Sequence, residues 1–430
     1  MTSAAAREPV PRLPALALVA YGAFGMPLAM AALPLYVHLP KFYGEHLGVG
    51  LTALGVLLLV LRLVDAVIDP LLGAWSDRGP ARKTLLAAAA PALAVGIVAL
   101  FMPPVTAEGP LLVWLGSALA VVYVAFSLAT INHNAWGAEL SSDPVERTRI
   151  TAVREGLALA GVVVASVAPG LLGGGGGETA GLPRAALAFA VVVLACAAFT
   201  VTFAPAARRG EAPADRTLFS GIAEALGDPL FRRLLVVFML NGIASAIPAT
   251  LILFFVADVL QAEGRQGLFL ALYFMAGAAG MPLWVRVSAR IGKVRAWHAG
   301  MLTAVVAFVW AARLGPGDII PFAVICAISG AALGADLALP PSLLADVIGR
   351  GGRMHATGSY FGLWTLATKL NLALAAGIGL PLIAVLGYTP GARGSGALTA
   401  LAITYAAVPS VLKLCAATAL FWFDRLWSRR

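Results

Sequence analysis

Three charged residues lie within an apolar stretch in the first quarter of the chain. Arg62, Asp65 and Asp69 occupy positions i, i+3 and i+7 of the segment GVLLLVLRLVDAVIDPLLGAW, so a helix would place all three on one face. A charged side chain at the centre of a bilayer costs about 2.5–3.5 kcal/mol on insertion scales. Charges at that depth are expected to face a partner or a water-filled path and to mark a site for an ion or a proton. This stripe therefore predicts a transporter that binds its coupling ion here.

The chemistry of the two carboxylates narrows what that ion is. Asp65 and Asp69 lie one helical turn apart, so their negative charges repel each other in a dry site. A proton on one of them, or a metal cation between them, relieves that repulsion. An internal salt bridge with Arg62 is the structural alternative to an ion site.

The elements that hold this stripe must be membrane helices. The 430 residues are 60% hydrophobic and only 12% charged, whereas soluble domains carry about 25% charged residues. Because a spanning helix needs about 20 apolar residues, the chain is predicted to be an all-α integral membrane protein with twelve spans. The predicted spans are 14–38, 50–76, 84–103, 110–137, 151–175, 183–205, 233–258, 266–288, 297–314, 319–341, 355–386 and 396–423.

The net charge of +9 is distributed by loop. Most lysines and arginines fall on one side of the predicted spans, and the positive-inside rule then places both termini in the cytoplasm of a multi-pass inner-membrane protein. Topology and attraction to anionic lipid explain the basic loops, so a nucleic-acid partner is not expected. The other side carries only Lys41, Arg184, Arg265, Arg313 and Arg393.

The chain divides into two similar halves. The connector Pro205–Asp228 is the longest polar stretch, and it predicts a bundle over residues 1–205, a cytoplasmic linker over 206–232 and a second bundle over 233–430. The segment PLLGAWSDRGPARK from Pro70 resembles PLWVRVSARIGKVR from Pro282, and AELSSDPVERTR resembles ADVIGRGGRMHA. Parallel six-span repeats of this kind are typical of the major facilitator fold, whose sites lie between the halves.

The loop after the second span resembles the cytoplasmic loop of that superfamily, G-x-x-x-D-R-x-x-x-R-K. The matching residues are Gly73, Asp77, Arg78, Arg82 and Lys83. The first four are expected to act in gating. Asp77 would pair with a neighbouring helix end in one conformation and release it in the other.

A more specific resemblance covers most of the chain. RLVDAVIDPLLGAWSDR is similar to the helix-two signature of the glycoside–pentoside–hexuronide:cation symporters, the melibiose permease group. NHNAWGAELSSDPVERTRITAVREG and GSYFGLWTLATKLNLALAAGIGLPLIAVLGY resemble the helix-four to helix-five segment and helix eleven of that group. The resemblance implies that Asp65 and Asp69 coordinate Na⁺, Li⁺ or H⁺ and that Lys369 lies near the cation. It also implies that Arg62 balances the carboxylates when the site is empty.

Two departures from this family favour H⁺ over Na⁺. Ile68 stands where the sodium-using members have an asparagine, and Ala129 stands where they have a threonine. Na⁺ is a hard cation that prefers several oxygen ligands, so the loss of two neutral oxygens hinders Na⁺ binding more than protonation. We expect no cofactor besides the coupling ion, H⁺ or Na⁺.

The sugar-binding positions of the family are only partly retained. Aspartates on helices one and four recognise sugar there, and the aligned residues here are Pro27 and Asn132. Proline cannot accept hydrogen bonds through its side chain, and asparagine replaces a carboxylate only in part. Trp136 and Arg154 match family positions near the sugar, where Trp136 either stacks on a ring or packs, and Arg154 either contacts the ligand or anchors the helix.

Three further residues are candidates for substrate binding. Asp336 is a carboxylate in the tenth span without an evident partner in the sequence, and it is interpreted as a substrate contact or a second proton site. Tyr360 and Trp364 in the eleventh span are expected to line the cavity, although such residues in membrane helices more often pack or form the interfacial belt.

Three classes of function were compared on these observations. The sequence favours a monomeric, cation-coupled symporter of a small solute, such as a sugar or glycoside, that works by alternating access. The alternative is a transporter of the same fold that moves an amphipathic, lipid-like substrate, since the sugar-binding carboxylates are missing. An enzyme is disfavoured because the sequence shows no nucleophile–base set, HExxH motif or cofactor loop.

Overall fold

The computed structural model describes residues 12–427 except 175–176, 208–216, 218, 263, 390 and 392. Residues 208–216 and 218, part of the predicted linker, lie outside the described residues. The long helices are α1 (Ala15–Ala23), α2 (Gly25–Leu33), α4 (Leu51–Arg78), α5 (Arg82–Phe101), α6 (Glu108–Glu139), α7 (Pro144–Gly173), α8 (Gly177–Phe203), α10 (Pro229–Phe254), α11 (Gln266–Ile291), α12 (Lys293–Phe308), α13 (Ile319–Arg350), α14 (Thr357–Val385) and α15 (Ser395–Trp427). The short elements are η1 (Pro34–His38), α3 (Leu39–Lys41), η2 (Phe42–His46), α9 (Ser220–Gly227), η4 (Phe255–Val259), η5 (Val309–Arg313) and η6 (Met354–Ala356).

Eleven of the twelve predicted spans are recovered among the described residues by length and apolar composition. Eleven segments are long and apolar enough to cross a membrane, and the first of them joins α1 and α2 over Ala15–Ala32. Helix α4, with 28 residues, covers the remaining predicted span, and its apolar stretch carries Arg62, Asp65 and Asp69. The helix that holds the predicted site is thus distinguished by the charges within it.

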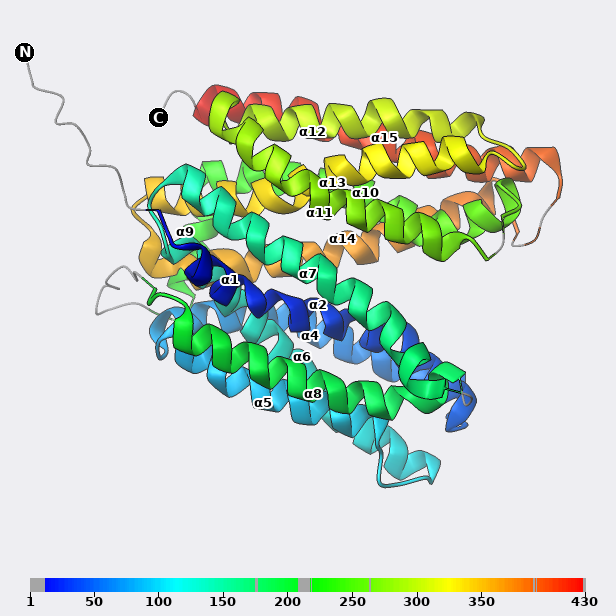
Figure 1. Ribbon diagram of the computed structural model, residues 1–430, viewed down its shortest axis with the longest axis horizontal. Coiled ribbons are helices and arrows are strands. Elements are labelled where there is room, and N and C mark those ends of the chain that lie inside the picture. The colour runs from blue at the N-terminus through cyan, green and yellow to red at the C-terminus, as the bar shows by residue number, and fades with distance from the viewer. Residues whose placement is uncertain are drawn as a thin grey trace, which may run out of the picture.

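The helices form two bundles that lie one above the other in Figure 1. Helices α1 to α8 make one bundle and α10 to α15 make the other. The contacts between them run mainly from α4 to α14 and from α7 to α13 and α11. The bundles come together at the end where α1 begins and α15 ends, and they diverge toward the opposite end (Figure 1).

Close approach of α4 and α14 depends on glycine. A Cβ atom at Gly73 would collide with the backbone of Gly358, and one at Gly362 would lie 2.7 Å from the carbonyl oxygen of Asp69. Small residues allow membrane helices to pack backbone against backbone. The contact places the candidate cation helix directly against the other bundle.

The longest extensions beyond the predicted ends are those of α7 and α13. Helix α7 begins at Pro144 rather than at 151, because Asp143 caps it by accepting a hydrogen bond from the Val145 amide at 2.7 Å. Helix α13 continues to Arg350 rather than ending at 341, although it contains Pro340 and Pro341. Both extensions lie at the end where the bundles meet, and they carry contacts between the bundles.

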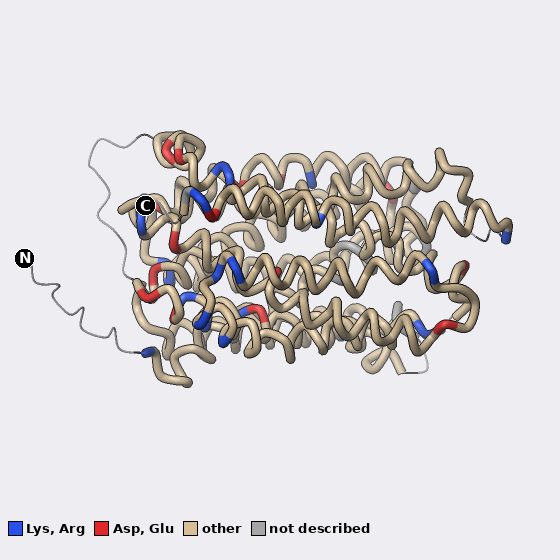
Figure 2. The backbone as a smooth tube through the Cα atoms, turned by 90° about the horizontal axis from the view of Figure 1, so that it is seen from above, with Lys and Arg blue, Asp and Glu red and all other residues tan. Residues whose placement is uncertain are grey.

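Charged residues are distributed unequally along the molecule. Figure 2 shows that lysine, arginine, aspartate and glutamate gather at the end that carries the C-terminus, with few charges in the middle of the helices. This distribution follows from the cost of charge within a bilayer. The few charges in the middle therefore need a specific explanation.

Candidate cation site and bundle contacts

The predicted cation residues meet at the interface between the bundles. Lys369 of α14 extends from the second bundle toward α4 of the first bundle. Its Nζ lies 2.7 Å from Oδ2 of Asp65 and 2.8 Å from Oδ2 of Asp69. Asp65 is 8% exposed and Asp69 is completely buried. The ammonium group therefore occupies the position that a cation bound to both carboxylates would take.

Ser127 of α6 completes the cluster. Its hydroxyl donates to Oδ1 of Asp65 at 2.9 Å and accepts from Nζ of Lys369 at 2.9 Å. Nothing in the sequence singled out Ser127, because a lone serine in an apolar helix usually bonds to its own backbone. Its role becomes visible only when α4, α6 and α14 are placed together.

Counted without Arg62, the side chains of this cluster carry one net negative charge. Asp65 and Asp69 contribute two negative charges and Lys369 contributes one positive charge. A buried charge without compensation is strongly unfavourable. These four residues can thus take up one further positive charge, as a proton or as a small cation that displaces the ammonium.

Arg62 lies one turn before Asp65 on α4 and is partly buried. Lys369 forms ion pairs with both carboxylates. The balancing role assigned to Arg62 stays a prediction.

Asp77, at the end of α4, contacts the beginning of α14. Its Oδ1 accepts from the Gly358 amide at 2.6 Å, and its Oδ2 accepts from the Ser359 amide and hydroxyl at 2.8 Å each. A carboxylate at a helix N-terminus satisfies unpaired amides and interacts favourably with the helix dipole. This cap joins the two bundles at the end where they meet.

Arg82 pairs with Asp77 and fixes the orientation of its carboxylate. Its guanidinium lies 3.1 Å from Asp77 and 2.7 Å from Glu139, and it is buried. It also donates to Oδ1 of Asn132 at 3.0 Å. Arg78 is exposed at the end of α4. Asn132, predicted to bind substrate, is thus held by the network around Arg82.

A second contact between the bundles is centred on Asp346 of α13. It accepts from Arg147 of α7 at 3.0 Å and from Lys293 of α12 at 2.5 Å. These residues were not among the functional residues predicted from the sequence, although the internal repeat pointed to Asp346. In that repeat Asp346 aligns with Glu139, which pairs with Arg82 in the first bundle.

Asp77→Asn is expected to open the end at which the bundles meet. Charge-assisted hydrogen bonds contribute about 1.5–3 kcal/mol each, and asparagine keeps only part of them. A cysteine replacing Ala345, which is 3% exposed, should therefore react about tenfold faster with a maleimide, since 1.4 kcal/mol is a factor of ten. The assay uses a background in which Cys196, Cys326 and Cys415 are serine.

The matched control for this experiment is Asp318→Asn. Asp318 accepts from the Gly315 amide at 2.9 Å within one bundle, so its removal should leave the reaction rate unchanged. Equal rates in wild type and Asp77→Asn would show that the Asp77 cap does not hold the bundles together.

The structure does not bring the predicted substrate residues to one place. Trp136 is buried and donates to the carbonyl of Pro205 at 3.0 Å. Arg154 is 6% exposed and pairs with Glu155. Tyr360 donates to Asp228 at 3.3 Å and Trp364 stacks on Phe238 with 3.8 Å between ring centroids. In this conformation their substrate contacts stay predictions, and Trp136, Tyr360 and Trp364 serve packing.

Asp336 has partners that the sequence did not reveal. Lys413 of α15 lies 2.8 Å from its Oδ2, and Trp297 of α12 donates to its Oδ1 at 2.9 Å. The role of Asp336 as a substrate contact or a second proton site stays a prediction. The partners come from helices distant in sequence.

Comparisons with known proteins agree with this architecture. The family described as "MFS/sugar transport protein" matches residues 18–424. A solved structure of a bacterial homologue of the iron transporter ferroportin, in an outward-facing state, superposes with a TM-score of 0.70 at 16% identity, covering 95% of this chain and 98% of that chain. The predicted all-helical, two-bundle fold class is confirmed.

Two relatives of Escherichia coli K12 match part of the sequence. YagG, named as a glycoside/cation symporter, is 29% identical over 133 residues, which are 30% of this chain and 29% of that protein. YicJ, named as an inner membrane symporter, is 27% identical over 131 residues, which are 29% of this chain and 28% of that protein. The matched stretch is less than a third of the length of either relative.

Proposed function

Because this chain belongs to the MFS/sugar transport protein family of the major facilitator superfamily, we propose that it couples the movement of a glycoside to that of a proton. It is a multi-pass membrane protein and a secondary transporter, not an enzyme. The coupling ion and the solute are the parts that we propose.

One observation carries the proposal for coupling, namely the ion pairs of Lys369 with both Asp65 and Asp69. These ion pairs join α14 of one bundle to α4 of the other. A cation at the carboxylates would compete with the ammonium and weaken the junction. Binding of the coupling ion would thus change the relative stability of the two conformations, as coupled transport requires.

The oxygen atoms around the pair support H⁺ as the coupling ion. The side chains that contact Lys369 offer the two carboxylates and the hydroxyl of Ser127. Ile68 and Ala129 contribute no side-chain oxygen. A hard cation such as Na⁺ prefers several oxygen ligands, whereas a proton needs one carboxylate oxygen. Lys369 also neutralises part of the negative charge of the two carboxylates, which lowers their attraction for a metal ion.

A glycoside is supported by the family description and by the name of YagG. A second candidate is an amphipathic, lipid-like solute. It is favoured by Pro27 at the first sugar-binding position and by Asn132, whose amide oxygen is engaged by Arg82.

Uptake by proteoliposomes distinguishes these solutes. We expect radiolabelled alkyl or aryl glycosides to enter proteoliposomes that contain the protein faster than protein-free liposomes. Transfer of fluorescent lysophosphatidylcholine should be equal in both preparations. Lysolipid transfer that depends on the protein, without uptake of any glycoside tested, would replace the first candidate by the second.

We also propose that both termini lie in the cytoplasm. The gathering of charged residues at the end where the C-terminus lies (Figure 2) supports this orientation. Cysteines introduced at Ala212, which lies outside the described residues, and at Gly391 should react with an impermeant maleimide from opposite sides of the membrane. Reaction from the same side would contradict the proposed topology. A monomeric state and the absence of any other cofactor remain part of the proposal.

A further inference from the structure

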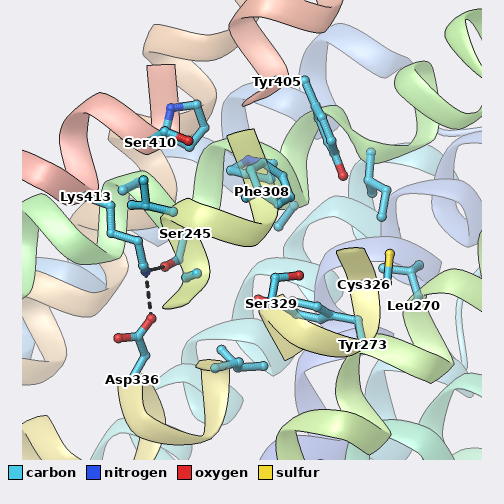
Figure 3. A pocket seen from close by; sticks show the side chains of 18 of the residues that line it. Ser245, Leu270, Tyr273, Phe308, Cys326, Ser329, Asp336, Tyr405, Ser410 and Lys413 are labelled. Carbon is cyan, nitrogen blue, oxygen red and sulfur yellow. Dashed lines mark hydrogen bonds and ion pairs between the residues drawn. The ribbon is translucent and has the colours of Figure 1, made fainter. Parts of the chain in front are cut away.

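A cavity lies inside the second bundle, separate from the cation site. Its walls are side chains of α10, α11, α12, α13 and α15. The cavity has a volume of about 100 Å³, and the empty space around it, which includes open solvent, is about 780 Å³. Figure 3 shows Lys413, Asp336 and Ser245 at one side of this cavity and Tyr405, Leu270 and Cys326 at the other. The cavity is thus polar at one side and apolar at the other.

The polar side is built around a buried ion pair. The side chains of Lys413 and Asp336 are each 9% exposed, and their charged atoms lie 2.8 Å apart. Replacing such a pair by apolar residues is often neutral or stabilising, so the pair is weak evidence for a role in stability. Ionisable residues within membrane helices instead indicate a functional site.

The hydrogen bonds of this pair leave one donor for a ligand. Lys413 donates to Asp336 and to Ser245 at 3.0 Å, while Asp336 also accepts from Trp297. An ammonium group has three N–H donors, and among the described residues the third has no acceptor. Since the charges of the pair cancel, a charged ligand would add an uncompensated charge, and a neutral ligand with an acceptor atom fits best.

The apolar side determines the size and shape of the ligand. Tyr273, Phe308 and Tyr405 contribute aromatic rings to the lining, and Leu270 contributes an aliphatic side chain. An apolar cavity of about 150 Å³ binds benzene, so the volume here suits a single ring that projects toward open space. Ligand sites in proteins generally combine such apolar walls with a few polar groups that fix orientation.

We propose that this cavity binds a neutral molecule with one six-membered apolar ring and a hydrogen-bond acceptor, such as a carbonyl oxygen, that receives the free N–H of Lys413. The proposal goes beyond the transport function and does not depend on the cation site. Binding can be measured in the absence of transport, so the two proposals fail independently.

The probe is 4-fluoroacetophenone, and the readout is the broadening of its ¹⁹F NMR signal by the full chain in lipid nanodiscs. Signal broadening in protein-free nanodiscs is subtracted. We expect broadening by wild type and by Leu253→Phe, because Leu253 is on α10 but is 54% exposed and outside the lining. Ala249→Phe, which fills the cavity from the same helix, should abolish it.

Lys413→Met tests the polar contact. Loss of one hydrogen bond of about 1 kcal/mol should weaken the binding of 4-fluoroacetophenone about fivefold. 4-Fluoroethylbenzene lacks the acceptor and should bind equally to wild type and Lys413→Met. Equal broadening by wild type and Ala249→Phe would overturn the proposed location. If Lys413→Met does not fold, Ala249→Phe and the comparison of the two probes on wild type still test the proposal. Equal affinity of wild type for both probes would overturn the role of Lys413.

Discussion

Asp69→Asn is expected to abolish the accumulation of solute against its gradient and to leave counterflow exchange measurable. In wild type Asp65, Asp69 and Lys369 together carry one net negative charge. Asparagine removes that charge, so the site resembles its protonated state and no longer takes up a proton. Exchange of internal for external solute does not require release of the proton, and it should therefore persist.

The measurement compares both activities in the same proteoliposomes. The accumulation ratio should fall to one, while counterflow should stay within about tenfold of wild type, a change of no more than 1.4 kcal/mol. Asp65→Asn should behave in the same way, and Asp318→Asn, whose carboxylate caps a loop far from α4, should accumulate solute normally. Accumulation by both site variants at the wild-type level would exclude this cluster as the coupling site.

Lys369→Met is expected to produce the largest loss of stability. The substitution leaves two adjacent buried carboxylates without the ammonium, and breaking a buried ion pair by removing one partner costs about 3–5 kcal/mol. It also removes the ion pairs that join α14 to α4. The purified variant should melt at a lower temperature in detergent and should not accumulate solute.

The double variant Lys369→Met/Asp65→Asn separates charge from packing. It restores the wild-type imbalance of one negative charge, so its melting temperature should lie above that of Lys369→Met alone. Lys83→Met is the matched control, because Lys83 donates to the carbonyl of Val201 at 2.9 Å and removing it leaves no unpaired carboxylate. Equal melting temperatures for the single and double variants would show that repulsion between the carboxylates is not the cause.

The candidate site could be predicted from the sequence only where charge is unusual for its surroundings. Asp65 and Asp69 were selected because carboxylates are rare in apolar helices, and the resemblance to the symporter family connected Lys369 with them. Ser127 carries no such signal. Its importance arises from the packing of three helices, and residues 127 and 369 are 242 positions apart.

The same limit applies to Asp336. Its partner Lys413 is 77 residues away, on a helix whose neighbours the sequence does not specify. Asn132 and Trp136 were interpreted from the family resemblance, and Tyr360 from its residue type. The structure shows that each is held by a hydrogen bond to another part of the chain.

The ends of the helices were harder to predict than their existence. Asp143 followed by Pro144 is a typical beginning of a helix, but the polar turn that follows resembled a loop when only apolar residues were counted. The span predicted over 319–341 ended at Pro340 and Pro341, and proline in a helix interior removes a backbone hydrogen bond. Membrane helices tolerate proline when neighbouring groups satisfy the freed backbone atoms, and α13 continues to Arg350.

The central claim, proton coupling at Asp65 and Asp69, is tested most directly by imposing each gradient alone. Proteoliposomes receive either a pH gradient without Na⁺ or a Na⁺ gradient at constant pH and ionic strength, and uptake of a labelled glycoside is followed in wild type and Asp69→Asn. The account predicts that the pH gradient drives accumulation by wild type only and that the Na⁺ gradient drives none. Accumulation driven by Na⁺ without a pH gradient would contradict it.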